Sequence, residues 1–146
     1  MSPVDVHLAE AAELPAARAV RWRVFVEEQG VPVELEYDGE DQRAHHAVAV
    51  LDGAVVGTGR LVVGDGGVGV VGRMAVVPPA RGRGVGAALL SLLEQRAGEL
   101  GLGAVELHAQ AHATGFYHRA GYAAVGAAYE EAGIPHVTMR KPLLRP

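Results

Sequence analysis

The feature that most constrains the fold of this chain is a glycine loop at residues 81–86 (RGRGVG). It follows an apolar run at residues 68–77 that two prolines close, and it precedes residues 87–100, where leucine and alanine recur at helical spacing. This order predicts a strand, a turn and a helix. Glycines at alternate positions let several backbone N–H groups point into one concavity, where the helix dipole favours negative charge. The loop therefore predicts an anion-binding site.

The spacing of the residues in the loop distinguishes between the known kinds of phosphate-binding loop. A Walker loop ends in Gly-Lys-Ser/Thr, and residues 86–88 (GAA) supply neither the cation nor the hydroxyl. The pattern G-x-G-x-x-A at residues 82–87 satisfies the dinucleotide fingerprint, but residues 78–81 separate it from its strand. The acidic residue expected at the end of the next strand is also missing, since Glu106 lies inside that strand. A tight glycine turn with no ligand is the other alternative.

The rest of the 146 residues predicts a single mixed α/β domain spanning residues 1–146. The strands are expected at residues 4–8, 47–51, 54–63, 68–77, 104–109, 121–126 and 136–139, and the helices at residues 13–29, 87–100 and 113–119. Asp52-Gly53 and residues 64–67 are hairpin signals, so three consecutive antiparallel strands precede the glycine loop. The strand at residues 104–109 should be parallel to its predecessor, because a whole helix crosses between them.

Composition excludes several classes of protein. The chain has no cysteine, which removes zinc fingers, thiol catalysis and disulfide scaffolds. Its formal net charge is −4 and its arginines are scattered, whereas a nucleic-acid-binding protein concentrates cations on one face. No apolar run approaches membrane-spanning length, and the N-terminus does not read as a signal segment. We therefore expect a soluble cytoplasmic protein with no nucleic-acid or membrane partner and no metal.

A resemblance to a known family emerges from these motifs together. The pattern Arg-x-x-Gly-x-Gly at residues 81–86 resembles the pyrophosphate loop of the GNAT superfamily of acyl-CoA N-acyltransferases, and the predicted order of elements is the GNAT order. Strings at residues 24–29 (VFVEEQ), 107–110 (LHAQ) and 131–136 (EAGIPH), with Phe116-Tyr117 and Gly121-Tyr122, resemble its ElaA-like branch. The resemblance runs from about residue 21 to residue 140.

The resemblance implies an acyl-CoA, with acetyl-CoA the favoured donor, in a cleft where the strands at residues 68–77 and 104–109 splay apart. The residues implied to bind this donor are Met74, Ala75, Val76, Arg81, Gly82, Arg83, Gly84, Val85, Gly86, Ala87 and Gln110. Gln110 stands where the family usually has Asn, and a strand-end residue that satisfies loop backbone is the alternative interpretation. The strand edge at residues 74–76 offers backbone partners to the pantetheine amides and an N–H to the developing oxyanion.

The resemblance places Tyr117 at the position of the family's general acid. A phenol with an ordinary pKa near 10 stays protonated at neutral pH and can donate to sulfur. The general base stays open among several side chains and a water chain; the side-chain candidates are Glu28, Glu36, His46, His108, His112 and His136. Glu28 and His136 belong to the ElaA-like strings and are expected on the substrate side.

These observations predict an enzyme that transfers an acetyl group from acetyl-CoA to a primary amine of a small molecule, peptide or protein, by direct attack in a ternary complex. A non-catalytic acyl-CoA-binding or regulatory module is the alternative, and the family also allows a homodimer. Residues 34–41 form the most acidic window of the chain. They are expected either to be a solvated charge run or to attract a cationic amine.

Overall fold

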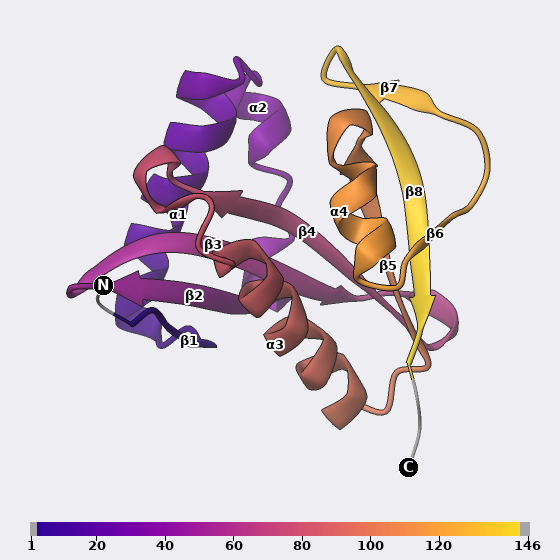
Figure 1. Ribbon diagram of the computed structural model, residues 1–146, viewed down its shortest axis with the longest axis horizontal. Helices are drawn as coiled ribbons and strands as arrows, with labels where there is room; N and C mark the ends of the chain where they lie inside the picture. The colour runs from indigo at the N-terminus through magenta and orange to yellow at the C-terminus, as the bar shows by residue number, and fades with distance from the viewer. Residues whose placement is uncertain (1–2, 144–146) are drawn as a thin grey trace.

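The computed structural model describes residues 3–143 as a twisted mixed sheet with helices on both faces (Figure 1). The strands are β1 (Asp5–Leu8), β2 (His45–Leu51), β3 (Ala54–Val63), β4 (Val68–Val76), β5 (Ala104–Gln110), β6 (Ala123–Ala124), β7 (Tyr129–Glu131) and β8 (Ile134–Pro142). The helices are α1 (Leu14–Arg21), α2 (Val33–Glu36), α3 (Val85–Glu99) and α4 (Thr114–Arg119). Within the described residues, no helix is long and apolar enough to cross a membrane.

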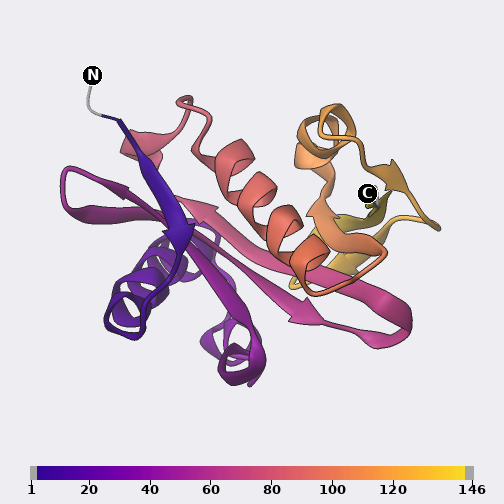
Figure 2. The same cartoon turned by 90° about the horizontal axis from the view of Figure 1, so that it is seen from below.

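The sheet has the order β1-β2-β3-β4-β5-β8-β6, and β7 pairs with β8 outside that path. All neighbouring strands are antiparallel except β4 and β5, which are parallel as the crossover helix α3 requires. Helices α1 and α2 lie on one face of the sheet, and α3 and α4 lie on the other (Figure 2). The predicted α/β fold and its single parallel pair are therefore confirmed.

Two apolar clusters hold these layers together. The larger cluster packs α3 against the sheet through fully buried side chains that include Leu89, Leu90 and Leu93. The smaller one packs α1 and the segment after it against β4, around Val20 and Val24. Each buried leucine contributes about 1.5–3 kcal/mol relative to exposure. The amphipathic pattern of α3 predicted this packing.

Some boundaries differ from those that the sequence predicts. Leu100, predicted on the apolar stripe of α3, is the exposed residue that ends the helix. Residues 129–135 were expected to connect two strands, but Tyr129–Glu131 forms β7, and only Ala132 and Gly133 make the turn into β8. Both turn residues have positive φ, as a type I′ hairpin turn requires. Beyond the turn, β8 starts two residues earlier than His136.

The first predicted helix continues as a π-helix, Trp22–Glu28, after α1 ends. The N–H of Gln29 donates to the carbonyl of Val24, five residues earlier, at 3.1 Å. This wider winding is uncommon and is found mainly at functional sites. It presents Phe25 and Gln29 to the same cleft in the sheet.

Candidate functional site

Strands β4 and β5 pair only along their first halves and then separate. Their parallel register runs from Val68 opposite Ala104 to Val71 opposite Leu107. A β-bulge follows at once, because two residues of β4, Arg73 and Met74, oppose a single residue of β3. Arg73 has φ of +52°, which is uncommon for a residue with a side chain. Since a bulge bends its strand, β4 turns away from β5 and the sheet opens.

A cleft of about 550 Å³ occupies this opening. Its walls come from β4, β5, α4 and the π-helix, which are distant in sequence. Seven of the residues predicted for the site line it: Met74, Ala75, Val76, Arg81, Gln110, Tyr117 and His136. The structure therefore brings the predicted strand edge, amide and phenol to one place.

The glycine loop forms a second hollow of about 260 Å³ at the N-terminus of α3. Gly84 is the N-cap of α3 with φ of +75°, and it offers no capping side chain. The first helical bond runs from the Ala88 N–H to the Gly84 carbonyl at 3.1 Å, so the preceding N–H groups have no partner within the helix. A Cβ built at Gly82 or Gly84 would meet nothing within 4 Å, so the backbone faces open space.

The hollow adjoins the cleft, because Val76 and Arg81 line both. Arg81 is fixed by three contacts: its Nε donates to the Val76 carbonyl at 2.9 Å, and its two Nη atoms donate to the Glu28 carboxylate at 2.8 and 2.7 Å. The hydrogen bonds from Arg81 lower the pKa of Glu28. Arg83, which the resemblance also assigns to the donor, lines a surface hollow near β1 together with Gly84 and Val85.

Tyr117 projects from α4 into the cleft and is half-buried. Its ring packs edge-on against Phe116 and Tyr122, with centroids 5.0 and 6.0 Å apart. Burial raises the pKa of the phenol, so the hydroxyl stays protonated at neutral pH. Within residues 3–143 that hydroxyl makes no hydrogen bond, whereas the Tyr122 hydroxyl donates to Glu94 at 2.7 Å.

Gln110 ends β5 with its amide held by two neighbours. Its Nε2 donates to the Gln29 side-chain oxygen at 2.9 Å, and the His112 Nε2 donates to its oxygen at 2.6 Å. These contacts join the end of β5 to the π-helix across the mouth of the cleft. Gln110 thereby has a fixed amide orientation that a free strand-end residue would lack.

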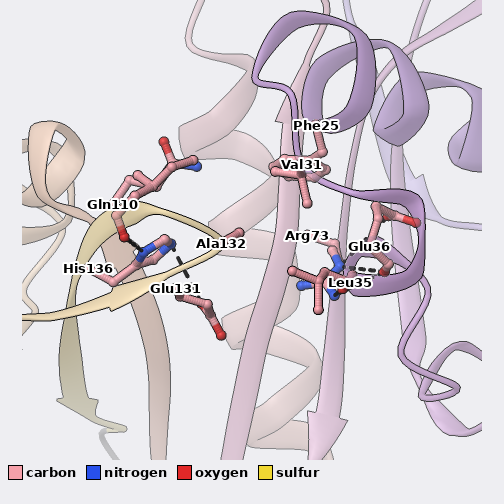
Figure 3. Close-up of a pocket in the computed structure, with 10 residues that line it drawn as sticks. Phe25, Val31, Leu35, Glu36, Arg73, Gln110, Glu131, Ala132 and His136 are labelled. Carbon is pink, nitrogen blue, oxygen red and sulfur yellow. Dashed lines mark hydrogen bonds and ion pairs between the residues drawn. The ribbon is translucent and has the colours of Figure 1, made fainter.

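A smaller cavity of about 210 Å³ continues the cleft between α2 and the β7–β8 hairpin (Figure 3). Its apolar lining consists of Phe25, Val31, Leu35, Ala132 and Ile134. Its polar lining consists of Glu36, Arg73, Gln110, Glu131 and His136. The α2 residues and the β8 histidine face each other across the space (Figure 3).

His136 is buried in the wall of this cavity. Its Nδ1 lies 2.7 Å from the Ile134 carbonyl, which can only accept, so Nδ1 carries a proton. Its Nε2 lies 3.6 Å from a carboxylate oxygen of Glu131. The ring stacks on Tyr129, whose hydroxyl bonds to Nδ1 of His108. Both ring nitrogens of His136 thus have defined surroundings.

The acidic window is mostly neutralised by arginines of other elements. Arg21 bonds to Glu36 at 2.6 Å and to Asp41 at 2.8 Å. Arg60 bonds to Asp38 and Asp41. Burial alone would raise the pKa of Asp38, but hydrogen bonds from Arg60 and from the Glu40 N–H, with the charges of Arg60 and Arg73, lower it to about 2. A solvated charge run is therefore the wrong description of Glu36, Asp38 and Asp41.

The other candidate bases are also placed by the structure. Glu36 is held by Arg21, and His46 bonds through Nε2 to the Asp41 carbonyl at 2.9 Å. His108 and His112 line the cleft but are exposed and engaged with Tyr129 and Gln110. Glu28 is not among the described residues that line the cleft or the smaller cavity. His136 is the candidate base that is both buried and in contact with both spaces.

The sequence did not single out two residues that shape the site. Arg73 holds α2 in place by donating to the carbonyls of Leu35 and Glu36 at 3.0 to 3.2 Å. No local pattern indicates a bulge at an arginine. Glu131 appeared only within the string at residues 131–136, and the Ala132-Gly133 turn that follows it is not one of the usual hairpin signals.

Known proteins resemble this chain over almost its whole length. The profile of the acetyltransferase (GNAT) domain matches residues 9–143. The N-acetyltransferase YjcF of Bacillus subtilis is 37% identical over 130 residues, covering 88% of this chain and 92% of that protein. Protein ElaA of Escherichia coli is 33% identical over 148 residues, covering 97% and 96%. The crystal structure of an acyl-CoA N-acyltransferase from Pseudomonas aeruginosa has a TM-score of 0.83 at 36% identity, covering 97% and 99%.

Proposed function

Because this chain belongs to the GNAT acetyltransferase family and is an acyltransferase, we propose that it transfers an acetyl group from acetyl-CoA to a primary amine. The amine attacks the thioester directly while both substrates are bound. The observation that carries the proposal is that the glycine-loop hollow adjoins the cleft between β4 and β5. An elongated molecule with an anionic end and an amide-containing arm suits such a site.

The glycine loop supplies the anion-binding end. The N–H groups of Val85, Gly86 and Ala87 lack partners within α3, and the positive end of the helix dipole adds to them. We assign the pyrophosphate to this hollow, with Gly82 and Gly84 leaving room for it. Arg81 lies where its guanidinium can exchange Glu28 for a phosphate oxygen.

The edge of β4 beyond Val71 supplies the arm-binding part. That edge has no β5 partner, so its outward N–H and C=O groups can bond to the pantetheine amides. Met74, Ala75 and Val76 line the cleft there. An N–H of this edge is suited to the thioester oxygen, where negative charge develops during attack. Gln110 adds a fixed amide on the opposite wall.

Tyr117 supplies the proton for the leaving group. The amine nitrogen forms a bond to the thioester carbon, and the carbonyl electron pair moves to oxygen. Collapse of this intermediate breaks the carbon–sulfur bond, and the Tyr117 hydroxyl protonates the thiolate. The attacking nitrogen loses a proton to solvent, and solvent returns one to the phenolate. The unpaired, protonated hydroxyl of Tyr117 favours this enzyme over a non-catalytic acyl-CoA-binding module.

Two measurements on the full chain test the proposal. Calorimetry with acetyl-CoA should show binding, and acetyl-CoA should raise the melting temperature by mass action. Free-thiol release should then appear when a panel of primary amines is added. Binding without thiol release from any amine would instead identify the non-catalytic module, and absence of binding would overturn the donor site.

A further inference from the structure

We infer that the acceptor is a small monoamine with an apolar body, whose ammonium is received between Glu131 and His136 in the cavity lined by α2 and the β7–β8 hairpin. This inference rests on the proposed acyl transfer and names the class of amine that the transfer uses. It also gives the two residues distinct roles: Glu131 binds the ammonium, and His136 takes its proton.

The size of the cavity limits the acceptor. Its volume is about 210 Å³. Sites for drug-sized ligands are larger, about 300–1,000 Å³. A compact amine fills this space, whereas a folded protein surface would deliver only one side chain to it.

The wall of the cavity selects an apolar body. Phe25, Val31, Leu35, Ala132 and Ile134 contribute carbon surface from three separate elements. Leu35 is 54% exposed although it lines the cavity. An exposed large apolar side chain in a concave site is typical of a surface that a ligand covers. A hydrocarbon body of the acceptor would bury Leu35.

The charges around the cavity select a single ammonium. Two carboxylates line it, and Glu36 is already paired with Arg21 and lies 3.7 Å from Arg73. Arg73 itself brings a positive charge to the wall, which disfavours a second cation. Glu131 is the remaining carboxylate, and its side chain is 59% exposed. A polyamine carries additional ammonium groups. Among the described residues that line the cavity, no further carboxylate is left to pair with them.

His136 and Glu131 are spaced to share one nitrogen. The gap of 3.6 Å between Nε2 and the carboxylate oxygen exceeds ordinary hydrogen-bond length, so the two groups do not satisfy each other. An ammonium nitrogen can lie about 2.8–3.0 Å from both atoms and donate one proton to each. The Ile134 carbonyl keeps the proton on Nδ1, which leaves the Nε2 lone pair as the acceptor.

The proton transfer follows from this placement. The N–H bond that points to Nε2 breaks, its electron pair stays on the amine nitrogen, and His136 becomes an imidazolium beside Glu131. The neutral amine then attacks the thioester, and His136 returns its proton to solvent. An alkyl ammonium has a pKa near that of lysine, about 10.4, so this step is needed at neutral pH.

The substrate experiment compares amines that differ in polarity, charge and size. Isoamylamine and phenethylamine represent apolar monoamines, ethanolamine a polar one, spermidine a polyamine, and a lysine-containing peptide a macromolecular acceptor. We expect the highest kcat/KM for the apolar monoamines, at least tenfold above spermidine and ethanolamine. A higher kcat/KM for spermidine, ethanolamine or the peptide would overturn the acceptor class while leaving acyl transfer intact.

The variant experiment separates the two roles. We expect Glu131→Gln to raise the KM of the amine tenfold or more without changing the KM of acetyl-CoA. Glu130→Gln is the matched control, because this neighbouring exposed carboxylate does not line the described cavity. Equal effects of the two substitutions, or no effect of either, would overturn the role of Glu131.

His136→Gln should lower kcat/KM by about 10²- to 10⁴-fold at pH 7, and the loss should shrink toward pH 9 because more amine arrives neutral. A merely structural role would give a loss that does not depend on pH. The titratable or charged groups that line the spaces around His136, or contact it, are Tyr129, Glu131, Glu36, Arg73, His108, His112, Asp38, Glu40, Arg43, Arg60, Arg81 and Tyr117. His118→Gln is the control, since His118 is exposed on α4 and lines neither space.

A binding measurement keeps this inference distinct from the proposed function. If no amine releases thiol, the acceptor class can still be tested by calorimetry, which measures whether isoamylamine binds to the protein with acetyl-CoA already bound. Binding that Glu131→Gln weakens and Glu130→Gln leaves unchanged would support the acceptor class even though the transfer proposal had failed. Absence of amine binding would overturn the acceptor class as well.

Discussion

Arg81 and Glu28 form a bidentate pair beside the cleft, in which Nη1 of Arg81 donates to Oε2 of Glu28 at 2.8 Å and Nη2 donates to Oε1 at 2.7 Å. The pair joins the glycine loop to the π-helix on the other face of the sheet. The side chains are 43% and 41% exposed, so solvent screens the interaction, and it contributes only about 0.2–1 kcal/mol to stability. Its importance is that Arg81 cannot hold Glu28 and a phosphate in the same way at once.

Glu28→Gln should therefore strengthen acetyl-CoA binding. The substitution removes the competing carboxylate, and the energy of such a pair corresponds to a decrease in Kd of up to about fivefold. Calorimetry measures the change, with Glu27→Gln as the control on an adjacent exposed carboxylate. An unchanged Kd would mean that Arg81 keeps Glu28 in the complex and only positions the loop.

Gly84→Val should abolish acetyl-CoA binding while the protein still folds. Gly84 has φ of +75°, so a β-branched residue strains the backbone by about 1–2 kcal/mol and also fills the space assigned to the pyrophosphate. Gly53→Val, in the β2–β3 turn at φ of +79°, introduces the same strain away from the site. Thermal unfolding should show a comparable loss in both variants. Unchanged binding by Gly84→Val would refute the assignment of the loop.

Tyr117→Phe should lower kcat by about 10²- to 10⁴-fold and leave the KM of the amine nearly unchanged. The ring and its edge-on contacts remain, and the lost hydroxyl has no partner within the described residues, so stability should barely change. Single-turnover kinetics should be used, so that chemistry is observed. A near-normal rate would show that Tyr117 is only an aromatic wall of the cleft.

Tyr122→Phe is the matched comparison and should lower the stability of the protein rather than kcat. The Tyr122 hydroxyl is buried against Glu94, which Lys141 also contacts at 3.0 Å. Loss of a hydrogen bond to a charged group should cost about 1.5–3 kcal/mol in the free energy of unfolding. Denaturant unfolding measures this loss, and kcat should remain within a few-fold of wild type. If Tyr122→Phe lowered kcat more than Tyr117→Phe does, Tyr122 rather than Tyr117 would be the general acid.

The ionisation of Asp38 should make the free energy of unfolding depend on pH in the acid range. Its pKa in the folded protein is about 2, below the ordinary value of 3.8. A lowered pKa means that the carboxylate contributes its full stabilisation above about pH 4 and loses it as the pH falls toward 2. Asp38→Asn should flatten the decline of unfolding free energy in that window, compared with the exposed control Asp65→Asn. Parallel curves for wild type and Asp38→Asn would contradict the shift.

Arg60→Met should be the most destabilising of these substitutions. Arg60 is buried and bonds to both Asp38 and Asp41, so its removal leaves carboxylates without their partner. Breaking a buried ion pair from one side typically costs about 3–5 kcal/mol. Denaturant unfolding against the wild type measures the loss. A cost below about 1 kcal/mol would indicate that Arg21 alone is enough to neutralise Asp41.

The sequence predicted those turns, strands and loops whose geometry depends on residues that are close together in the chain. Asp52 and Gly53 form the turn that their sequence indicates, and both have positive φ. The crossover helix required β5 to be parallel to β4, and the structure has that pairing. The glycine loop was found for the same reason, since its geometry follows from three residues that are close in sequence.

Contacts between distant segments could not be predicted in this way. The charges of Arg21 and Asp41 were visible, but nothing in the sequence shows that they lie 2.8 Å apart. The strand Tyr129–Glu131 is only three residues long and forms because β8 pairs with it. The bulge at Arg73 depends on the register of two strands, so it appears only when the sheet is assembled.

Arg73 belongs to the strand that borders the donor cleft, yet its guanidinium holds the carbonyls of α2, which forms a wall of the acceptor cavity. On the proposed assignment of donor and acceptor, both substrate sites therefore depend on Arg73, which lines both spaces. Thermodynamic linkage makes any coupling through it reciprocal: the factor by which bound acetyl-CoA changes the affinity for the amine is the factor by which the amine changes the affinity for acetyl-CoA. The bend of β4 at Arg73 is thus the place through which the two proposed substrate sites would change each other's affinity.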